Sequence, residues 1–297
     1  MLNSTNGESS EQFWDEVMET SEGEREAIEI DLLLEGIYRL YGYDFRNYVR
    51  SSIRRRIHNR MRLEKLSTIT ALLEKILYDE QAAARLMKDF SINVTEMYRD
   101  PSFYRAIRAN VVPHLKKLPT IRIWHAGCST GEEVISMAIL LEEEGLLHKT
   151  SIFATDMNAA VLEKAKTGAC PLSRMQTYTK NYLQAGGSRE FSAYYTTDAG
   201  HAYFDAALLR TVTFFQHNLV TDRSFNEFHV IICRNVLIYF NTALQNRAHE
   251  LFRESLSGCG FLGLGSKESL TFLDSLHHYD VVEPTEKIYR KKKKEIL

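Results

Sequence analysis

The segment "INVTEMYRDP" (92–101) concentrates polar side chains that make directional contacts. Within seven positions it holds an amide, a hydroxyl, a carboxylate, a phenol and a guanidinium, on Asn93, Thr95, Glu96, Tyr98 and Arg99. A linker between two domains is usually small, flexible and well solvated. The composition of this segment therefore differs from that of an ordinary linker, and the segment needs a role beyond joining two domains.

A glycine-containing loop lies at "WHAGCSTGEEV" (124–134), after a short apolar run. Gly127 and Gly131 allow the backbone to approach a ligand closely, and the helix that follows offers free N–H groups at its start. The Lys-Ser/Thr pair of a P-loop is missing, and Glu132 and Glu133 stand in its place. Two carboxylates would repel a triphosphate and suit a positively charged ligand, such as an amino or sulfonium group. The alternative is an ordinary tight turn between a strand and a helix.

Asp156 ends a second apolar run, "TSIFATD", 25 residues after Gly131. In nucleotide-binding α/β folds, a carboxylate at this place accepts hydrogen bonds from the ribose hydroxyls. Asp156 could instead cap the next helix, although Asn158 can serve that purpose. The loop and Asp156 together favour an adenosine-type ligand, and they leave nicotinamide nucleotides and S-adenosylmethionine equally possible.

Two more apolar runs, "TVTFFQHN" and "FHVIICRN", end abruptly in polar residues. Asn218 ends the first, and Arg234 and Asn235 end the second. In an open parallel sheet, ligands bind at the carboxyl ends of the strands, where these side chains would project. The alternative for Arg234 is a structural ion pair with one of the glutamates.

The order of these segments predicts an α/β fold. Residues 29–92 are typical of helices, and from 121 onward apolar strands alternate with helices, which favours a mostly parallel sheet covered on both faces. "HYDVVEPTEKIYRKK" is typical of a closing hairpin. The alternation breaks between 171 and 210, where we predict a small antiparallel β-subdomain.

Charge and cysteine content narrow the class of protein. The 297 residues have a net charge of −2, although residues 1–30 hold nine acidic residues against Arg25 alone. We expect 1–28 to be an acidic, poorly ordered tail. The four cysteines form no C-x-x-C pair, so a zinc site or a disulfide framework is not expected. No signal peptide or membrane helix is evident, which predicts a cytoplasmic protein that does not insert into a membrane. We also expect a monomer.

In this order and spacing, "NVTEMYRD", "AGCSTGEEV", "ATDMN" and "IICRNVLIYF" resemble the motifs of the CheR-type chemoreceptor glutamate methyltransferases. The resemblance covers roughly residues 30–290. It implies an all-helical N-terminal domain, then an S-adenosylmethionine-dependent methyltransferase domain of Rossmann-like α/β fold with a small β-subdomain. It also implies methyl transfer to glutamate side chains on the cytoplasmic helices of chemoreceptors.

The resemblance assigns roles residue by residue. It implies cofactor contacts from Asn93, Thr95, Arg99, Glu133, Asp156, Asn218, Leu219, Arg234 and Asn235. It makes 93–118 an active-site linker that folds over the cofactor, with the methyltransferase domain at 119–297. This chain departs from the family at Val134 and Ile135, where Pro-Tyr is common, and at "GSKE" (265–268), where Gly-His-Ser-Glu is common. In some relatives the region corresponding to 171–210 docks a receptor tail peptide.

Methyl transfer to a carboxylate needs no general base, because glutamate with its pKa of ~4.3 is already ionised at pH 7. The protein must position the acceptor and exclude water. Arg99 and Tyr239 are our candidates for orienting the acceptor oxygens, although Tyr239 could be a core residue. The Asn-Pro-Pro-Tyr/Phe tetrapeptide of amide and adenine methyltransferases is absent, which speaks against a nucleic-acid acceptor. The alternative function is a non-catalytic cofactor-binding sensor or scaffold in a chemosensory pathway.

An arginine-rich stretch, 46–62, is expected to form one helix. Val49, Ile53, Ile57 and Met61 recur at i+4 spacing and would face inward, leaving Arg46, Arg50 and Arg54 together on an outward face. A solvated basic face is one alternative. Nucleic-acid binding is another, because clustered arginines also bind phosphate, but the acidic N-terminal segment and the net charge of −2 speak against it. Because receptor methylation helices present rows of glutamates, we predict that these three arginines bind the substrate.

Overall fold

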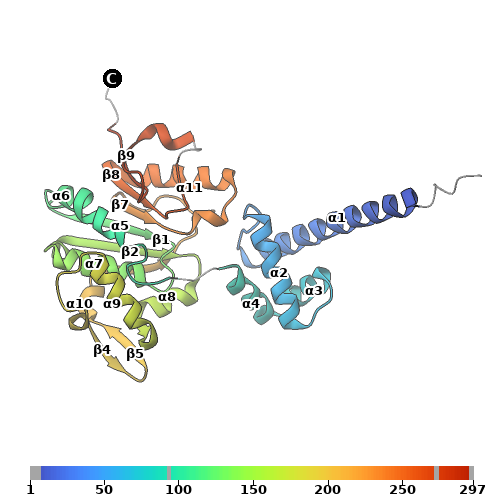
Figure 1. Cartoon of the computed structure of the whole chain (residues 1–297), viewed down its shortest axis with the longest axis horizontal. Helices are drawn as coiled ribbons and strands as arrows, with labels where there is room; N and C mark the ends of the chain where they lie inside the picture. Colours follow the sequence, from blue (N-terminus) through green and yellow to red (C-terminus); the bar gives the residue numbers. More distant parts are fainter. Residues whose placement is uncertain (1–7, 92–94, 271–273, 294–297) are drawn as a thin grey trace, which may run out of the picture. The chain divides into compact units, whose positions relative to one another are not determined.

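The computed structural model describes residues 8–91, 95–270 and 274–293. The chain divides into two compact units, residues 1–92 and 93–297, which are coloured along the sequence in Figure 1. Within the described ranges, no helix has the length and apolar character needed to span a membrane.

The first unit is helical. Its helices are α1 (Glu8–Tyr41), α2 (Arg50–Glu64), α3 (Ile69–Tyr78) and α4 (Glu80–Phe90). Buried apolar side chains from all four helices form its core, among them Leu33, Ile57, Leu72 and Leu86. The side chains of Thr68 and Asp79 cap α3 and α4 by accepting hydrogen bonds from backbone N–H groups of the first turn.

Two expectations for this unit were wrong. The segment 8–28 is helical rather than a poorly ordered tail, because α1 begins at Glu8 and continues into a part of the helix whose Leu33 and Ile37 are fully buried. The arginine-rich helix begins at Arg50 rather than at 46, since the chain turns at Phe45 and Tyr48, whose backbone groups are hydrogen-bonded to each other.

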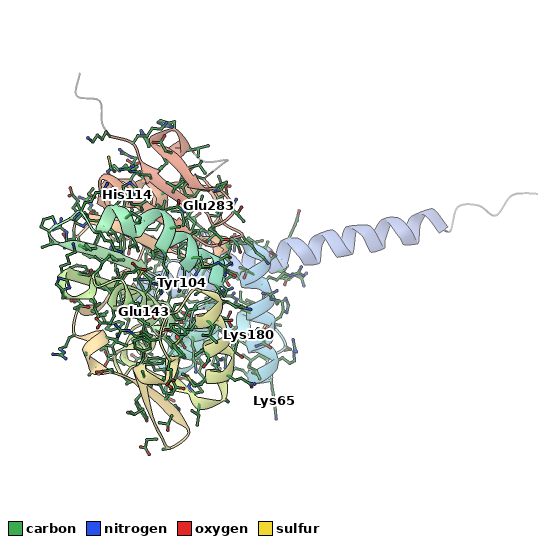
Figure 2. The ribbon with its side chains drawn as sticks, turned by 60° about the vertical axis from the view of Figure 1, so that its left-hand side comes forward. Lys65, Tyr104, His114, Glu143, Lys180 and Glu283 are labelled. Carbon is green, nitrogen blue, oxygen red and sulfur yellow. The ribbon has the colours of Figure 1, made fainter. Side chains whose placement is uncertain are left out.

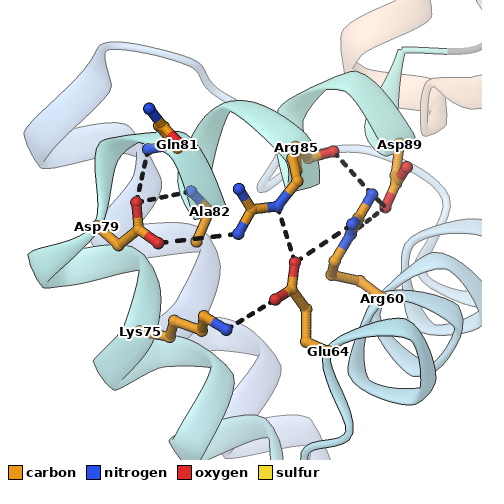
Figure 3. Close-up of polar contacts among 8 residues, drawn as sticks. All are labelled: Arg60, Glu64, Lys75, Asp79, Gln81, Ala82, Arg85 and Asp89. Carbon is orange, nitrogen blue, oxygen red and sulfur yellow. Dashed lines mark hydrogen bonds and ion pairs between the residues drawn. The ribbon is translucent and has the colours of Figure 1, made fainter.

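A charged cluster joins three helices of this unit (Figure 3). The Glu64 carboxylate on α2 accepts hydrogen bonds from Lys75 Nζ at 2.7 Å and from Arg85 Nε at 2.8 Å. Arg60 donates to Asp89 on α4 at 2.6 Å. The bonds from Lys75 and Arg85 lower the pKa of Glu64 to about 2. Through its ion pairs with Asp89 and Glu64, Arg60 helps to hold this unit together.

The second unit is built on a seven-stranded sheet. Its strands are β1 (Ile121–Ala126), β2 (Thr150–Asp156), β6 (Val212–Gln216), β7 (Phe228–Cys233), β8 (Leu256–Leu264), β9 (Tyr279–Glu283) and β10 (Ile288–Lys291). Their spatial order is β6-β2-β1-β7-β8-β10-β9. The first five strands pair in parallel, and β10 pairs antiparallel with both β8 and β9. The closing hairpin places this sheet in the mixed class.

Helices cover both faces of this sheet. They are α5 (Pro101–Ala106), continued by a π-helical turn (Ile107–Val111) and α6 (Val112–Leu115), then α7 (Glu132–Glu143), α8 (Ala159–Lys166), α10 (Ala206–Leu209) and α11 (Thr242–Ser255). Successive side chains of a strand point to opposite faces. Ile123 of β1 belongs to the buried cluster that includes α7, and its neighbour Trp124 contacts Phe252 of α11 at 5.7 Å between ring centroids. The α/β fold expected from the sequence is confirmed.

A second sheet lies between α8 and β6 in the chain. Its three antiparallel strands are β3 (Ala169–Pro171), β5 (His201–Phe204) and β4 (Tyr195–Asp198), in that spatial order, with α9 (Met175–Gln184) between β3 and β4. Glu143, labelled at the end of α7 in Figure 2, ties this subdomain to the main one. Its carboxylate accepts the backbone N–H of Ser188 at 2.9 Å and the hydroxyl of Tyr182 at 2.5 Å.

Candidate active site

The sheet order reverses next to β1, which is where open parallel sheets have their ligand crevice. The chain runs from β1 to β2 and β6 on one side, then crosses to β7 on the other side. In open parallel sheets, ligands bind at the carboxyl ends of the strands where the order reverses in this way. The predicted site residues follow these strands: Glu133 after β1, Asp156 at the end of β2, Asn218 after β6, and Arg234 and Asn235 after β7.

The glycine loop after β1 is held in a conformation that its sequence makes possible. Gly127 has φ +80°, and a Cβ at this position would lie 2.5 Å from Cγ2 of Val236, so only glycine fits. Ser129 also has a positive φ of 51° and donates its backbone N–H to Oδ2 of Asp156 at 3.0 Å. Its buried hydroxyl has no hydrogen-bond partner in the described part of the chain. Ser129 is not among the site residues predicted from the sequence, because a positive φ at serine has no sequence signal.

Asp156 is buried at the end of β2, with 8% of its surface exposed. Oδ2 accepts from Ser129 and Oδ1 accepts from the backbone N–H of Asn158 at 2.9 Å. Burial raises the pKa of Asp156, and the backbone hydrogen bonds oppose that shift. Asn158, as expected, caps α8 by accepting from Ala160 N at 3.0 Å. Asp156 therefore fixes the glycine loop, and its backbone hydrogen bonds still leave acceptor capacity on the carboxylate for a ligand.

Glu133 lies in the first turn of α7 and remains ionised. His125 Nδ1 lies 2.9 Å from its Oε1, and Arg234 Nη1 donates to its Oε2 at 3.4 Å. Burial alone would raise the pKa of Glu133, but the hydrogen bond with His125 and the charge of Arg234 outweigh burial, and the net shift is downward. An ionised carboxylate at this point suits the positively charged ligand predicted from the sequence.

Arg234 makes the structural ion pair that the sequence left open. Besides Glu133, its guanidinium donates to Oδ2 of Asp100 at 2.6 Å, and its Cζ lies 4.2 Å from the ring centroid of Phe103. Its buried Nε has no partner among the described residues. Arg234 therefore joins the start of α7 to the turn that follows Arg99, and its contact with the cofactor stays a prediction.

Arg99 lies between two residues with unusual backbone geometry. Tyr98 has φ +51° and Asp100 has φ +55°, a region that costs non-glycine residues about 1–3 kcal/mol each. Tyr98 is fully buried and donates its backbone N–H to Oγ of Ser136 on α7 at 3.0 Å. The packing of this turn against α7 therefore fixes the backbone of Arg99, whose side chain is partly exposed.

The turn after β7 carries Arg234, Asn235 and Tyr239. Asn235 has φ +61°, and Tyr239 closes a short 3₁₀ turn, Leu237–Tyr239, with its side chain partly exposed. Glu268, which lies 33 residues beyond Asn235 in the sequence, accepts hydrogen bonds from the backbone of this turn. Glu268 belongs to the "GSKE" segment, and no role was predicted for it from the sequence.

Four of the eight non-glycine residues with positive φ in the described ranges lie in these loops, namely Tyr98, Asp100, Ser129 and Asn235. Strained backbone persists only where surrounding contacts over-determine it, and it gathers at functional sites. The strain therefore marks the same crevice as the strand order does.

The remaining predicted cofactor contacts are placed as follows. Oδ1 of Asn218 accepts from Val220 N at 2.9 Å, which forms a tight turn after β6, and Leu219 is buried. The carbonyl of Thr95 accepts from Nη1 of Arg174, in the turn before α9, at 3.2 Å. Asn93 lies outside the described residues. The contacts of these residues with the cofactor stay predictions.

The three arginines predicted to bind substrate are paired with acids of the helical unit. Arg54 bonds Glu26, Arg50 bonds Asp31, and Arg46 bonds Glu35 and Asp44. Their side chains still keep 60%, 50% and 37% of their surface exposed, respectively. The three arginines therefore belong to surface ion pairs and are not free cations.

The residues of the crevice fit an S-adenosyl ligand. Such a ligand carries a ribose diol, a sulfonium and an amino acid group. The Asp156 carboxylate can accept from the diol, the ionised Glu133 suits the positive groups, and the unpartnered Ser129 hydroxyl can serve as a further donor or acceptor.

The sequence of this chain is similar to those of known families and proteins. Residues 93–288 match the CheR methyltransferase, SAM binding domain, and residues 28–91 match the CheR methyltransferase, all-alpha domain. "Putative methyltransferase Cher3" of Pseudomonas putida is 49% identical over 264 residues, which are 89% of this chain and 97% of that protein. "Chemotaxis protein methyltransferase 1" of Vibrio cholerae is 32% identical over 221 residues, 70% and 77% of the two chains. "Chemotaxis protein methyltransferase" of Listeria monocytogenes is 27% identical over 236 residues, 77% and 85% of the two chains.

The matches to the family's two domains together cover most of the chain, and they agree with the two units of the structure. The chain therefore belongs to the CheR methyltransferase family, and its cofactor is S-adenosylmethionine.

Proposed function

We propose that this methyltransferase converts glutamate side chains of chemoreceptor cytoplasmic helices to methyl esters. The observation that carries the proposal is the fixed turn at Arg99, where a partly exposed arginine lies between two positions of strained backbone. A planar guanidinium grips both oxygens of a carboxylate. The names of the Vibrio and Listeria relatives support a chemotaxis substrate.

The reaction requires positioning more than acid–base chemistry. The bound S-adenosylmethionine supplies a methyl group on a positively charged sulfur. Because the acceptor carboxylate is already ionised, transfer of this methyl group to it would require no residue of this chain to take up a proton. In this proposal Arg99 and Tyr239 hold the acceptor carboxylate in line, and the buried loops exclude water.

The arginine face of α2 is our proposal for the receptor contact. Arg50 and Arg54 keep half or more of their side-chain surface exposed, whereas Arg46 is held by Asp44, by Glu35 and by contact with the ring of Tyr38. Arg46 therefore contributes more to the fold of the unit than the other two.

We expect the double variant Arg50→Gln/Arg54→Gln to raise the KM for receptor. Exposed charge pairs contribute about 0–1 kcal/mol each, so the expected rise is about three- to tenfold at low salt and smaller at high salt. The Kd for S-adenosylhomocysteine should not change. Steady-state kinetics on receptor fragments at two salt concentrations measure the effect. An unchanged KM at low salt would show that these arginines are only a solvated face.

Labelled methyl transfer to receptors, followed by mild base, tests the activity itself. A methyl ester releases labelled methanol in base, whereas methylated nitrogen does not. A non-catalytic sensor would bind the cofactor and transfer nothing.

A further inference from the structure

The side chain of Glu268 is hydrogen-bonded to the turn after β7, which carries three of the proposed site residues. Its Oε1 accepts the backbone N–H of Val236 at 2.9 Å and of Leu237 at 2.7 Å. Its Oε2 accepts the N–H of Asn235 at 3.0 Å and of Gly265 at 2.6 Å. One carboxylate therefore satisfies four backbone donors, three of them consecutive.

The three N–H groups of this turn have no strand partner that could replace Glu268. The turn follows the end of β7, and Asn235 has a left-handed backbone conformation. Glu268 is only 5% exposed, so water is a poor substitute for its oxygens. Gly265 is also fitted to this contact: a Cβ there would lie 2.7 Å from Oε2 of Glu268 and 2.9 Å from the backbone N of Asn235. The chain thus brings two distant segments together around one carboxylate.

We propose that Glu268 is a positioning residue for methyl transfer, which acts by fixing the backbone between Arg234 and Tyr239. It touches neither substrate nor cofactor in this account. Its four hydrogen bonds set the direction in which Arg234 and Asn235 face the crevice and the place of Tyr239 after them. The inference rests on the proposed roles of these residues.

Glu268→Gln tests the proposal, because glutamine has the same shape but only one carbonyl oxygen for four donors. We expect about tenfold weaker binding of S-adenosylhomocysteine and a similar fall in kcat, with the KM for receptor unchanged. Gly265→Ala keeps the carboxylate but forces a methyl group between it and Asn235, so it should reproduce the same split. The matched control is Glu143→Gln, which removes a carboxylate that also accepts a backbone N–H, at the far end of α7.

The control should lower Tm and leave Kd and kcat of the folded protein unchanged. If Glu268→Gln and Gly265→Ala fold and have the Kd and kcat of the wild type, with only Tm lowered, the proposal is wrong. Glu268 would then only stabilise the fold. Wild-type enzyme that binds S-adenosylhomocysteine but transfers no methyl group would contradict the proposed function instead, and the Kd comparison would still decide the role of Glu268.

A second inference comes from a separate observation, the ion pairs between side chains of α1 and arginines of α2 and the turn before it. In sequence order along α1, three acidic side chains form ion pairs: Glu26 with Arg54, Asp31 with Arg50 and Glu35 with Arg46. The partners thus run in opposite order along α2 and the turn before it. The Glu26 carboxylate also lies 2.5 Å from Nε2 of His58, and the bond from Arg54 keeps its pKa below the usual value. A row of acidic residues on α1 therefore already pairs with the arginines proposed to contact an acidic receptor helix.

We infer that this acidic row of α1 competes with the receptor helix for the same arginines. The α1 helix extends beyond the residues that match the family's all-alpha domain, which begin at 28, so Glu26 belongs to the extension. The pairs are exposed, and exposed pairs are weak enough to exchange for equivalent carboxylates of a partner. This inference rests on the proposed receptor contact of Arg50 and Arg54.

The test is a double-mutant cycle on the KM for receptor. Glu26→Gln/Asp31→Asn frees both arginines and should lower KM about threefold at low salt, with kcat unchanged. Glu24→Gln/Glu29→Gln is the matched control, because it removes two charges from the same helix that make no ion pair with the described arginines of α2. In the Arg50→Gln/Arg54→Gln background, the Glu26/Asp31 change should have no effect.

Each outcome decides a separate point. An unchanged KM in Glu26→Gln/Asp31→Asn, beside a raised KM in the arginine variant, would overturn the competition alone. An equal fall of KM in the control would mean that general charge, and not release of the arginines, causes the effect. An unchanged KM in the arginine variant would contradict the proposed receptor contact itself.

Discussion

Arg99→Lys should lower kcat by about 100-fold while weakening S-adenosylhomocysteine binding less than about fivefold. Lysine keeps the positive charge but loses the planar fork that can hold two carboxylate oxygens. A small misplacement of a reacting group is enough to cost about 100-fold in rate. The backbone of this position is fixed by its strained neighbours Tyr98 and Asp100, so a lysine cannot reposition itself by moving the chain.

Single-turnover methyl transfer with saturating cofactor measures this effect without a contribution from binding. Arg105→Lys is the control, because Arg105 is an exposed arginine on α5, bonded to the carbonyl of Gln184. The control should keep the wild-type rate. Near-normal single-turnover rates for Arg99→Lys would exclude an orienting role for its guanidinium.

Asp156→Ala should weaken S-adenosylhomocysteine binding by about 1.5–3 kcal/mol, the range for hydrogen bonds to a charged group. The variant loses the acceptor proposed for the ribose diol, and it also releases the N–H of Ser129 in the glycine loop. Asp156→Asn separates the two effects, because one amide oxygen can still hold the loop while the charge is lost. We expect Asn to give an intermediate Kd in isothermal titration.

Asn158→Ala is the control for Asp156. It removes the cap of α8 and should cost about 1 kcal/mol of stability, with no change in Kd. Wild-type affinity in a folded Asp156→Ala protein would restrict Asp156 to holding the loop.

Local patterns in the sequence were sufficient for the strands, the glycine loop and the cap at Asn158. These features depend on residues a few positions apart, and their physical causes are turn geometry, apolar periodicity and capping. The positions of Asp156 and Arg234 at the ends of their strands also predicted that both lie at the carboxyl-end side of the sheet, since parallel strands bring their carboxyl ends together.

Contacts between distant segments could not be predicted in this way. Arg234 and Asp100 are 134 residues apart, and Glu268 joins Asn235 across 33 residues. Nothing in the local sequence distinguishes a glutamate that accepts four backbone N–H groups from one on the surface. The pairing of Glu26 with Arg54 was missed for another reason: charge composition alone made the acidic segment resemble a tail, although it continues into a packed helix.

The most direct test of the central claim is the chemistry of the transferred methyl group. Purified protein, labelled S-adenosylmethionine and receptor-rich membranes should give a labelled receptor band whose label is released as methanol by mild base. Replacing the acceptor glutamates of the receptor by alanine should abolish the label. Base-stable label, or no label under conditions where the protein binds the cofactor, would contradict the account.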